Sequence, residues 1–110
     1  MQKQFKKMKI TARDISERKE FNRCGIHYTQ VYADDTNHIY LYKMDNRDYS
    51  YELVQGKRRK NPDGTIVYTY PGDEDFGTHG WYISGTKEYT ERRIAEKIHS
   101  LTGSEPKIRV

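Results

Sequence analysis

The sequence predicts an α+β fold, in which an antiparallel β-meander of four to five strands packs against an N-terminal and a C-terminal helix. Segments rich in Tyr, Val, Ile and Thr alternate with turn residues between positions 27 and 70, which is typical of strands. Capped segments with helical spacing of apolar residues lie on either side. Although only 34% of the residues are hydrophobic, ten tyrosines supply apolar area for a core. We therefore expect a basic arm over residues 1–10 and one α+β domain over residues 11–110.

The first helix is predicted over residues 11–24. Thr11 and Asp14 have the spacing of a capping box, and Gly25 stands where a helix commonly ends in a left-handed conformation. The apolar stripe of this segment consists of Ala12, Ile15, Phe21 and Cys24.

Four strands follow, and the lengths of their turns predict how they pair. The strands are expected at 27–33, 38–44, 49–57 and 65–70, with turns at 34–37, 45–48 and 61–64. If these turns have the stated lengths, Tyr40 faces Leu53, Tyr42 faces Tyr51, and Gln55 faces Tyr70. This register places six tyrosines on one face of the sheet: Tyr40, Tyr42, Tyr49, Tyr51, Tyr68 and Tyr70.

The tyrosine face has two interpretations, a hydrophobic core or a stacking platform for unpaired bases, and its apolar character favours the core. The opposite face then carries an aliphatic strip. If the N-terminal helix leaves this strip uncovered, it is a candidate surface for a partner chain. The strip consists of Ile39, Leu41, Val54 and Val67.

The C-terminal part is predicted to contain an irregular glycine-rich connection over residues 71–86, with a short strand at 81–84. A helix from about Lys87 to Leu101 follows, with Thr86 as its N-cap and Gly103 at its end.

Charge is distributed unevenly along the chain. The first 25 residues carry eight basic and three acidic side chains, a net charge of +5, which leaves −1 for residues 26–110 because the whole chain carries +4. Phosphate binding would therefore depend mainly on the N-terminal segment, together with a basic run at 57–60. The candidate nucleic-acid-binding residues are Lys3, Lys6, Lys7, Lys9, Lys57, Arg58, Arg59, Lys60, Arg92 and Arg93.

Acidic residues are predicted to gather at one end of the sheet, where Asp45 and Asp48 would meet Asp73, Glu74 and Asp75. This end could receive a basic partner surface or a divalent cation, although solvated loops are the favoured interpretation because the spacing matches no calcium loop. With the aliphatic strip, the candidate partner-binding residues are Ile39, Leu41, Val54, Val67, Asp73, Glu74 and Asp75.

Chemistry-bearing residues give weak signals. Cys24 is the only cysteine, so an internal disulfide is excluded, and Cys24 with His27 forms at most half of a zinc site. A small ribonuclease could combine His79 with Glu52 and Arg58, but nothing in the sequence places these residues together. We predict no catalytic residues, no cofactor and no metal. Because no signal peptide or membrane span is apparent, we expect a cytoplasmic protein.

Two functional hypotheses remain in front. The first is a non-catalytic protein-binding module, an adaptor or inhibitor that occupies the surface of another protein or of a second copy in a homodimer. The alternative is a nucleic-acid-binding protein that uses its basic arm and the basic run at 57–60. A ribonuclease-like enzyme is the least favoured.

Overall fold

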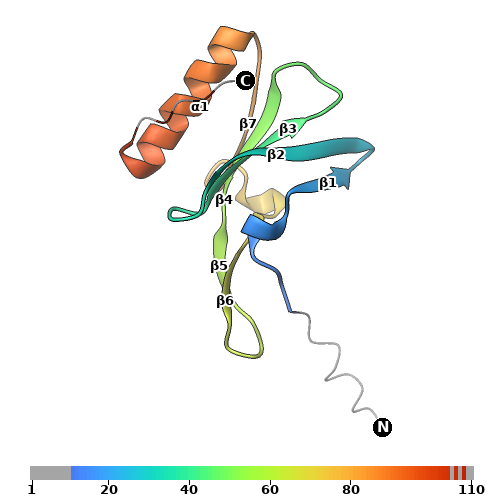
Figure 1. Cartoon of the computed structure of the whole chain (residues 1–110), viewed down its shortest axis with the longest axis vertical. Helices are drawn as coiled ribbons and strands as arrows, with labels where there is room; N and C mark the ends of the chain where they lie inside the picture. The colour runs from blue at the N-terminus through green and yellow to red at the C-terminus, as the bar shows by residue number, and fades with distance from the viewer. Residues whose placement is uncertain (1–10, 105, 107, 109–110) are drawn as a thin grey trace.

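The computed structural model describes residues 11–104, 106 and 108, which form two antiparallel sheets and one long helix (Figure 1). The main sheet has five strands in the order β1-β2-β3-β4-β7, and β5 and β6 form a separate hairpin. The strands are β1 (Glu20–Arg23), β2 (Ile26–Asp34), β3 (Ile39–Met44), β4 (Ser50–Gln55), β5 (Lys57–Lys60), β6 (Ile66–Thr69) and β7 (Gly80–Ser84). The helix is α1 (Lys87–Thr102), and two short 3-10 turns are η2 (Ile15–Glu17) and η3 (Asp73–Asp75).

The α+β class and the C-terminal helix are confirmed. The Thr86 side chain accepts a hydrogen bond from the backbone N of Tyr89 at 3.2 Å, and Gly103 ends the helix with a φ of 81°. The inner face of α1 buries Ile94 and Ile98. None of the helices in the described part of the chain is long and apolar enough to cross a membrane.

The predicted N-terminal helix is wrong: residues 11–24 contain the turn η2 and the edge strand β1. Arg23 pairs with Ile26, so Cys24 and Gly25 form a two-residue hairpin turn. Both have positive φ angles, 52° and 78°, as a type I′ turn requires. A glycine suited to positive φ therefore serves a hairpin here rather than a helix end. Asp14 does act as an N-cap, but of η2, where its side chain accepts from Ser16 N.

The predicted register between the second and third strands is wrong by one residue. Tyr40 pairs with Val54 rather than Leu53, and Tyr42 pairs with Glu52 rather than Tyr51. The connection contains five residues instead of four, because Tyr49 adopts a positive φ of 52° and stays outside the strand. When the pairing of two strands shifts by one residue, the side chains of one strand lie on the opposite face of the sheet from the one predicted.

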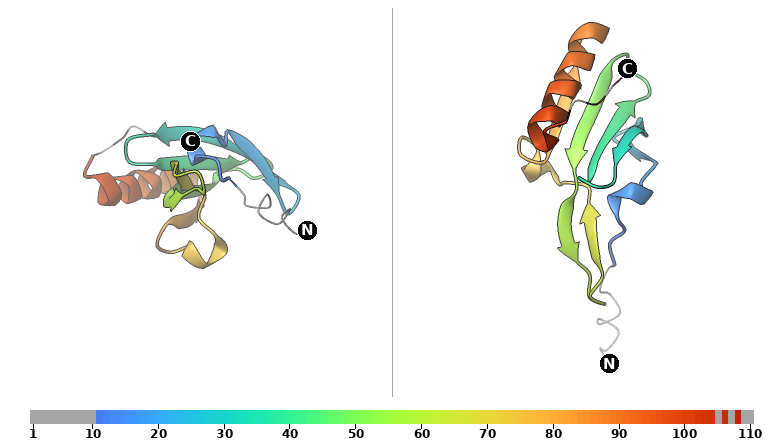
Figure 2. Two further views of the ribbon diagram at one scale, coloured as in Figure 1. Left: turned by 90° about the horizontal axis from the view of Figure 1, so that it is seen from below. Right: turned by 60° about the vertical axis from the view of Figure 1, so that its left-hand side comes forward.

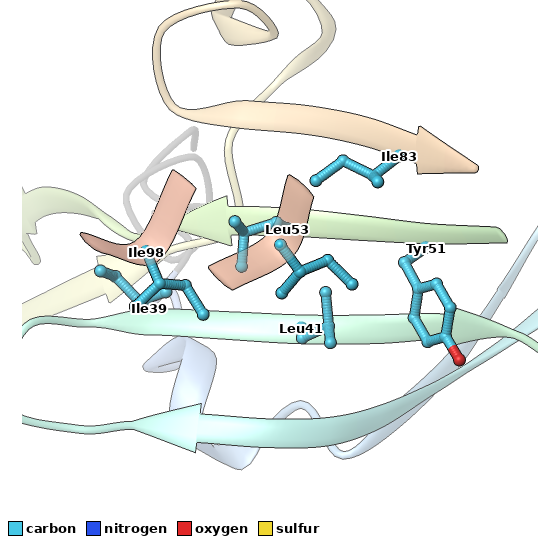
Figure 3. Close-up of a cluster of buried hydrophobic side chains, with 7 residues drawn as sticks. Ile39, Leu41, Tyr51, Leu53, Ile83 and Ile98 are labelled. Carbon is cyan, nitrogen blue, oxygen red and sulfur yellow. The ribbon is translucent and has the colours of Figure 1, made fainter. Parts of the chain in front are cut away.

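Each face of the main sheet carries a buried hydrophobic cluster. On one face, α1 covers a cluster that we call the helix-side core, which contains Ile39, Leu41, Tyr51, Leu53, Ile83, Ile94 and Ile98 (Figure 3). The opposite face carries the far-side core, which contains Ile15, Tyr28, Tyr40, Tyr42, Met44 and Val54, with Phe21, Tyr68, Tyr70 and Phe76 packed against it. The six tyrosines are thus divided between the two faces.

The expected accessible aliphatic strip is therefore absent. Ile39 and Leu41 lie under α1, whereas Val54 belongs to the far-side core. All four strip residues are at most 7% exposed, Val67 being the most exposed of them. The one-residue shift in register separates Val54 from Leu41 and places it on the other face.

The segment at 65–70 does not extend the main sheet as a fourth strand. Among the described strands, β6 pairs with β5 alone, and β7, at the place of the predicted short strand, lies beside β4 instead. Gly56 joins β4 to β5, and a Cβ atom there would lie 2.8 Å from Cβ of Tyr68. The hairpin projects beyond the main sheet, at the end away from α1 (Figure 2, right).

Candidate nucleic-acid interface

The basic run at 57–60 forms strand β5 of the projecting hairpin. Arg58, Arg59 and Lys60 are exposed, whereas Lys57 is half-buried and its Nζ lies 3.1 Å from Oδ1 of Asp75. The strand therefore presents three exposed cations in succession.

The described chain starts beside the tip of this hairpin. The backbone N of Ala12 donates to Oδ1 of Asn61 at 2.9 Å, and Nδ2 of Asn61 donates back to the Ala12 carbonyl at 3.0 Å. Asn61 directly follows β5 and is buried. A third bond, from Tyr68 N to Oδ2 of Asp14 at 3.0 Å, holds the segment along β6. The basic arm, whose Lys3, Lys6, Lys7 and Lys9 lie outside the described residues, joins the fold at this point.

A cleft of about 560 Å³ lies between this N-terminal segment and the hairpin. Three arginines line it: Arg13 and Arg18 from the segment and Arg59 from β5. The guanidinium carbon of Arg18 lies 4.0 Å from the ring centroid of Phe21 and 4.8 Å from that of Tyr70. These cation–π contacts hold Arg18 in place while its side chain remains exposed.

Carboxylates also line the cleft, and two of the three already have partners within the chain. Burial alone would raise the pKa of Asp14, but hydrogen bonds from the backbone amides of Ser16 and Tyr68 lower it below its usual value. Glu20 contacts the imidazole of His27 at 2.7 Å. Glu17 is the third acidic residue of the lining.

An ion pair with a buried carboxylate lies in the far-side core. Glu52 is 6% exposed and pairs with Arg23. The Tyr70 hydroxyl donates to Oε1 of Glu52 at 2.5 Å, while Nη2 of Arg23 also donates to the Tyr28 hydroxyl at 3.0 Å. Burial, followed by the hydrogen bond to Glu52, raises the pKa of Tyr70. Burial alone would lower the pKa of Arg23, but the hydrogen bond to Tyr28 and the charge of Glu52 raise it.

The residues of the ribonuclease hypothesis are not brought together by any contact that the structure describes. The polar partners of Glu52 are Arg23, Tyr28 and Tyr70. His79 contacts the Thr78 hydroxyl through its Nδ1, while Arg58 is exposed on the hairpin.

The predicted acidic end is wrong. Asp45 and Asp48 lie in the loop that leads into β4, whereas η3, with Asp73, Glu74 and Asp75, lies near the end of β4, where Gln55 N donates to the His79 carbonyl. Asp75 pairs with Lys57, and Asp45 accepts from the Thr29 hydroxyl at 2.9 Å. Within the residues that the structure describes, no group of three His, Cys, Asp or Glu side chains could hold a metal ion.

Arg92 and Arg93 do not join the basic hairpin. Both lie on α1, where they pair with Glu96 at 3.9 and 3.3 Å, and α1 occupies the other end of the molecule (Figure 2). Conversely, Arg13, Arg18 and Tyr70 line the cleft but were not among the predicted candidates. The signal for the two arginines was the charge excess of the first 25 residues, whereas Tyr70 reaches the cleft through the fold and has no such signal.

Comparison of the chain with protein families, curated proteins and solved structures finds no match.

Proposed function

We propose that this protein binds nucleic acid through a basic end made of the β5–β6 hairpin and the N-terminal segment that runs along it. The observation that carries the proposal is the pair of hydrogen bonds between Ala12 and Asn61. They bring the N-terminal segment to the end of the basic run, although Ala12 and Asn61 are 49 residues apart in the sequence.

The charge of this end supports the proposal. Its described cations are Arg13, Arg18, Arg58, Arg59 and Lys60, and the arm adds four lysines to them. Its carboxylates are Asp14, Glu17, Glu20 and Asp63, and all of these except Glu17 accept hydrogen bonds from the chain's own amides or imidazole. The described residues of this end contribute five cations and four carboxylates, so most of the positive excess that contacts with phosphates require would come from the four lysines of the arm.

We expect contacts with the phosphate backbone rather than stacking on bases. Tyr40, Tyr42 and Tyr51 are at most 2% exposed, so these central tyrosines of the main sheet offer no open stacking platform. Proteins that bind single strands by stacking need accessible aromatic faces. Binding should therefore depend steeply on salt and vary little with base sequence.

Part of the protein-binding hypothesis was an open aliphatic strip, but all four of its residues are buried: Ile39, Leu41 and Val54 in the two cores, and Val67 on β6. Binding of a partner protein or a second copy stays a prediction without a defined surface, so nucleic-acid binding takes precedence.

Charge removal at matched sites tests the proposal. Fluorescence anisotropy with labelled DNA and RNA would compare the full chain with the double variant Arg58→Gln/Lys60→Gln. The control Arg92→Gln/Arg93→Gln loses the same charge from α1. The hairpin variant should bind roughly tenfold more weakly at low salt, because it loses two phosphate contacts, while the control should bind nearly as the unchanged protein does.

Removal of residues 1–10 provides a second comparison. If the arm contributes phosphate contacts, the shortened chain should lose affinity to a similar degree for every sequence tested. Absence of binding to any nucleic acid at low salt, or equal loss in the hairpin and α1 variants, would contradict the proposal.

A further inference from the structure

His27 on β2 lies between two carboxylates from different parts of the sheet. Its Nε2 is 2.7 Å from Oε1 of Glu20 on β1, and its Nδ1 contacts Oδ2 of Asp45, which follows β3. The backbone N of Asp45 also donates to the His27 carbonyl at 2.9 Å. The imidazole thus links the edge strand β1 to the β3–β4 loop across β2.

The chemistry of these groups fixes the protonation state that satisfies both contacts. An ionised carboxylate only accepts hydrogen bonds, and a neutral imidazole can donate from one nitrogen only. Both contacts can form together only when His27 carries two protons. Hydrogen bonds from His27 and Thr29 lower the pKa of Asp45, so the shared proton belongs to the histidine.

We propose that His27 is a pH-sensitive clasp that holds strand β1 against the rest of the sheet when it is protonated and releases Glu20 when it loses a proton. Asp45 is the better-held carboxylate, because it also accepts from Thr29 at 2.9 Å. The neutral imidazole therefore keeps its proton on Nδ1, toward Asp45. Its Nε2 lone pair then faces Glu20, whose side chain is 67% exposed and free to turn into solvent.

The charges around His27 favour the protonated state. Hydrogen bonds to Asp45 and then to Glu20 raise the pKa of His27 above its ordinary value of 6.5. Lys43 on β3 lies near Asp45 and is the cation on this side, while Asn22, which is neutral, pairs with His27 from β1. A raised pKa in the closed state means that the clasp stabilises β1 fully below pH 6.5 and loses this contribution as the pH rises through the folded pKa.

Because of the position of β1, the contribution of the clasp affects the local opening of the β1–β2 hairpin. β1 is a strand of four residues at the edge of the main sheet, and among the described strands it pairs with β2 alone. It carries Phe21 and Arg23 over the far-side core. Edge strands open at lower free energy than central strands, so one lost contact shifts the opening equilibrium of the β1–β2 hairpin without unfolding the domain. The clasp does not rest on the proposed binding of nucleic acid, although it shares Glu20 with the lining of the cleft.

The test combines a histidine titration with amide hydrogen exchange on the full chain. NMR would give the pKa of His27 directly, and exchange of the β1–β2 amides, corrected for intrinsic rates, would give the opening constant from pH 5 to pH 8. We expect a pKa above 6.5 and an opening constant that rises with pH. Linkage sets the size of the rise: its factor equals the ratio of the His27 acid dissociation constants in the open and closed states.

Two surface variants make the result decisive. Glu20→Gln should bring the pKa of His27 down toward 6.5, and His27→Gln should leave the opening constant of β1 independent of pH over this range. The α1 amides serve as the internal control, since none of the described hydrogen-bond partners of Glu20, His27 and Asp45 lies on α1. A His27 pKa at or below 6.5, or an opening of β1 that changes with pH no more than that of α1, would overturn the proposal.

Discussion

Thr90 is a polar residue at a fully buried position of α1. Its side chain is fully buried between α1 and the sheet, and its hydroxyl has no hydrogen-bond partner among the described residues. A buried hydroxyl without a partner costs free energy that an isosteric methyl group does not.

Replacing Thr90 with Val should therefore raise the free energy of unfolding by about 1 kcal/mol, as chemical denaturation would measure. The matched control is Thr102→Val on the same helix. The Thr102 hydroxyl donates a hydrogen bond to the Ile98 carbonyl at 2.9 Å, so its removal should not raise the free energy of unfolding. A Thr90→Val protein that is less stable than the unchanged chain would show that the hydroxyl has a partner in solution.

At the Arg23–Glu52 pair, by contrast, we expect a substitution to lower the free energy of unfolding. Arg23→Met would leave the Glu52 carboxylate buried without its cation, and should lower the free energy of unfolding by about 2 kcal/mol, less than a fully buried pair because Arg23 is 36% exposed. The double variant Arg23→Met/Glu52→Gln should recover much of this loss in a double-mutant cycle. Additive effects of the two substitutions would show that the pair does not interact.

Single residues also explain why the register could not be predicted. Tyr49 and His38 both adopt positive φ, 52° and 60°, which bulky side chains rarely do. Nothing local in the sequence marks such a position, because the conformation depends on packing: Tyr49 packs against the helix-side core, and the His38 ring stacks on Tyr68 at 3.5 Å. Tyr49 alone, by staying outside the strand, shifted the β3–β4 register by one residue and so changed which side chains of β3 and β4 share a face of the sheet.

Among the elements, the β5–β6 hairpin depends most on its surroundings. Isolated two-stranded hairpins are only marginally stable. This one is supported by the N-terminal segment, through Asn61 and Asp14, and by a close junction at Gly56.

Gly56→Ala should destabilise the protein by roughly 1 to 3 kcal/mol, because the new Cβ would lie 2.8 Å from Cβ of Tyr68 and 3.3 Å from Cγ2 of Ile15. Thermal unfolding would measure the loss. A variant as stable as the unchanged chain would mean that β5 and β6 can move apart without cost.

The elements that were predictable have local signals. The caps of α1 at Thr86 and Gly103 lie within its own sequence, so its bounds could be predicted nearly to the residue. The N-terminal segment lacked such a signal, since Gly25 suits a helix end and a type I′ turn equally well, and only the pairing of Arg23 with Ile26 decides between them.

For the whole molecule, the α+β class follows from composition and pattern, whereas the strand order does not. Strand 65–70 follows its neighbour closely in the sequence, but β7 takes the place beside β4 and leaves β5–β6 as a separate hairpin. The same rearrangement determines the candidate site. The basic run could be recognised in the sequence, but the contact between Ala12 and Asn61, which follows the run, is long-range and is visible only in the fold.

The salt dependence of binding tests the central claim most directly. For duplex DNA, a plot of the logarithm of the association constant against the logarithm of the salt concentration has a slope of about −0.9 for each phosphate contact. We expect a steep negative slope for the full chain, reduced in magnitude by about 2 in Arg58→Gln/Lys60→Gln and unchanged in Arg92→Gln/Arg93→Gln. Binding that is insensitive to salt, or a slope that the hairpin variant leaves unaltered, would contradict a phosphate-binding role for the basic end.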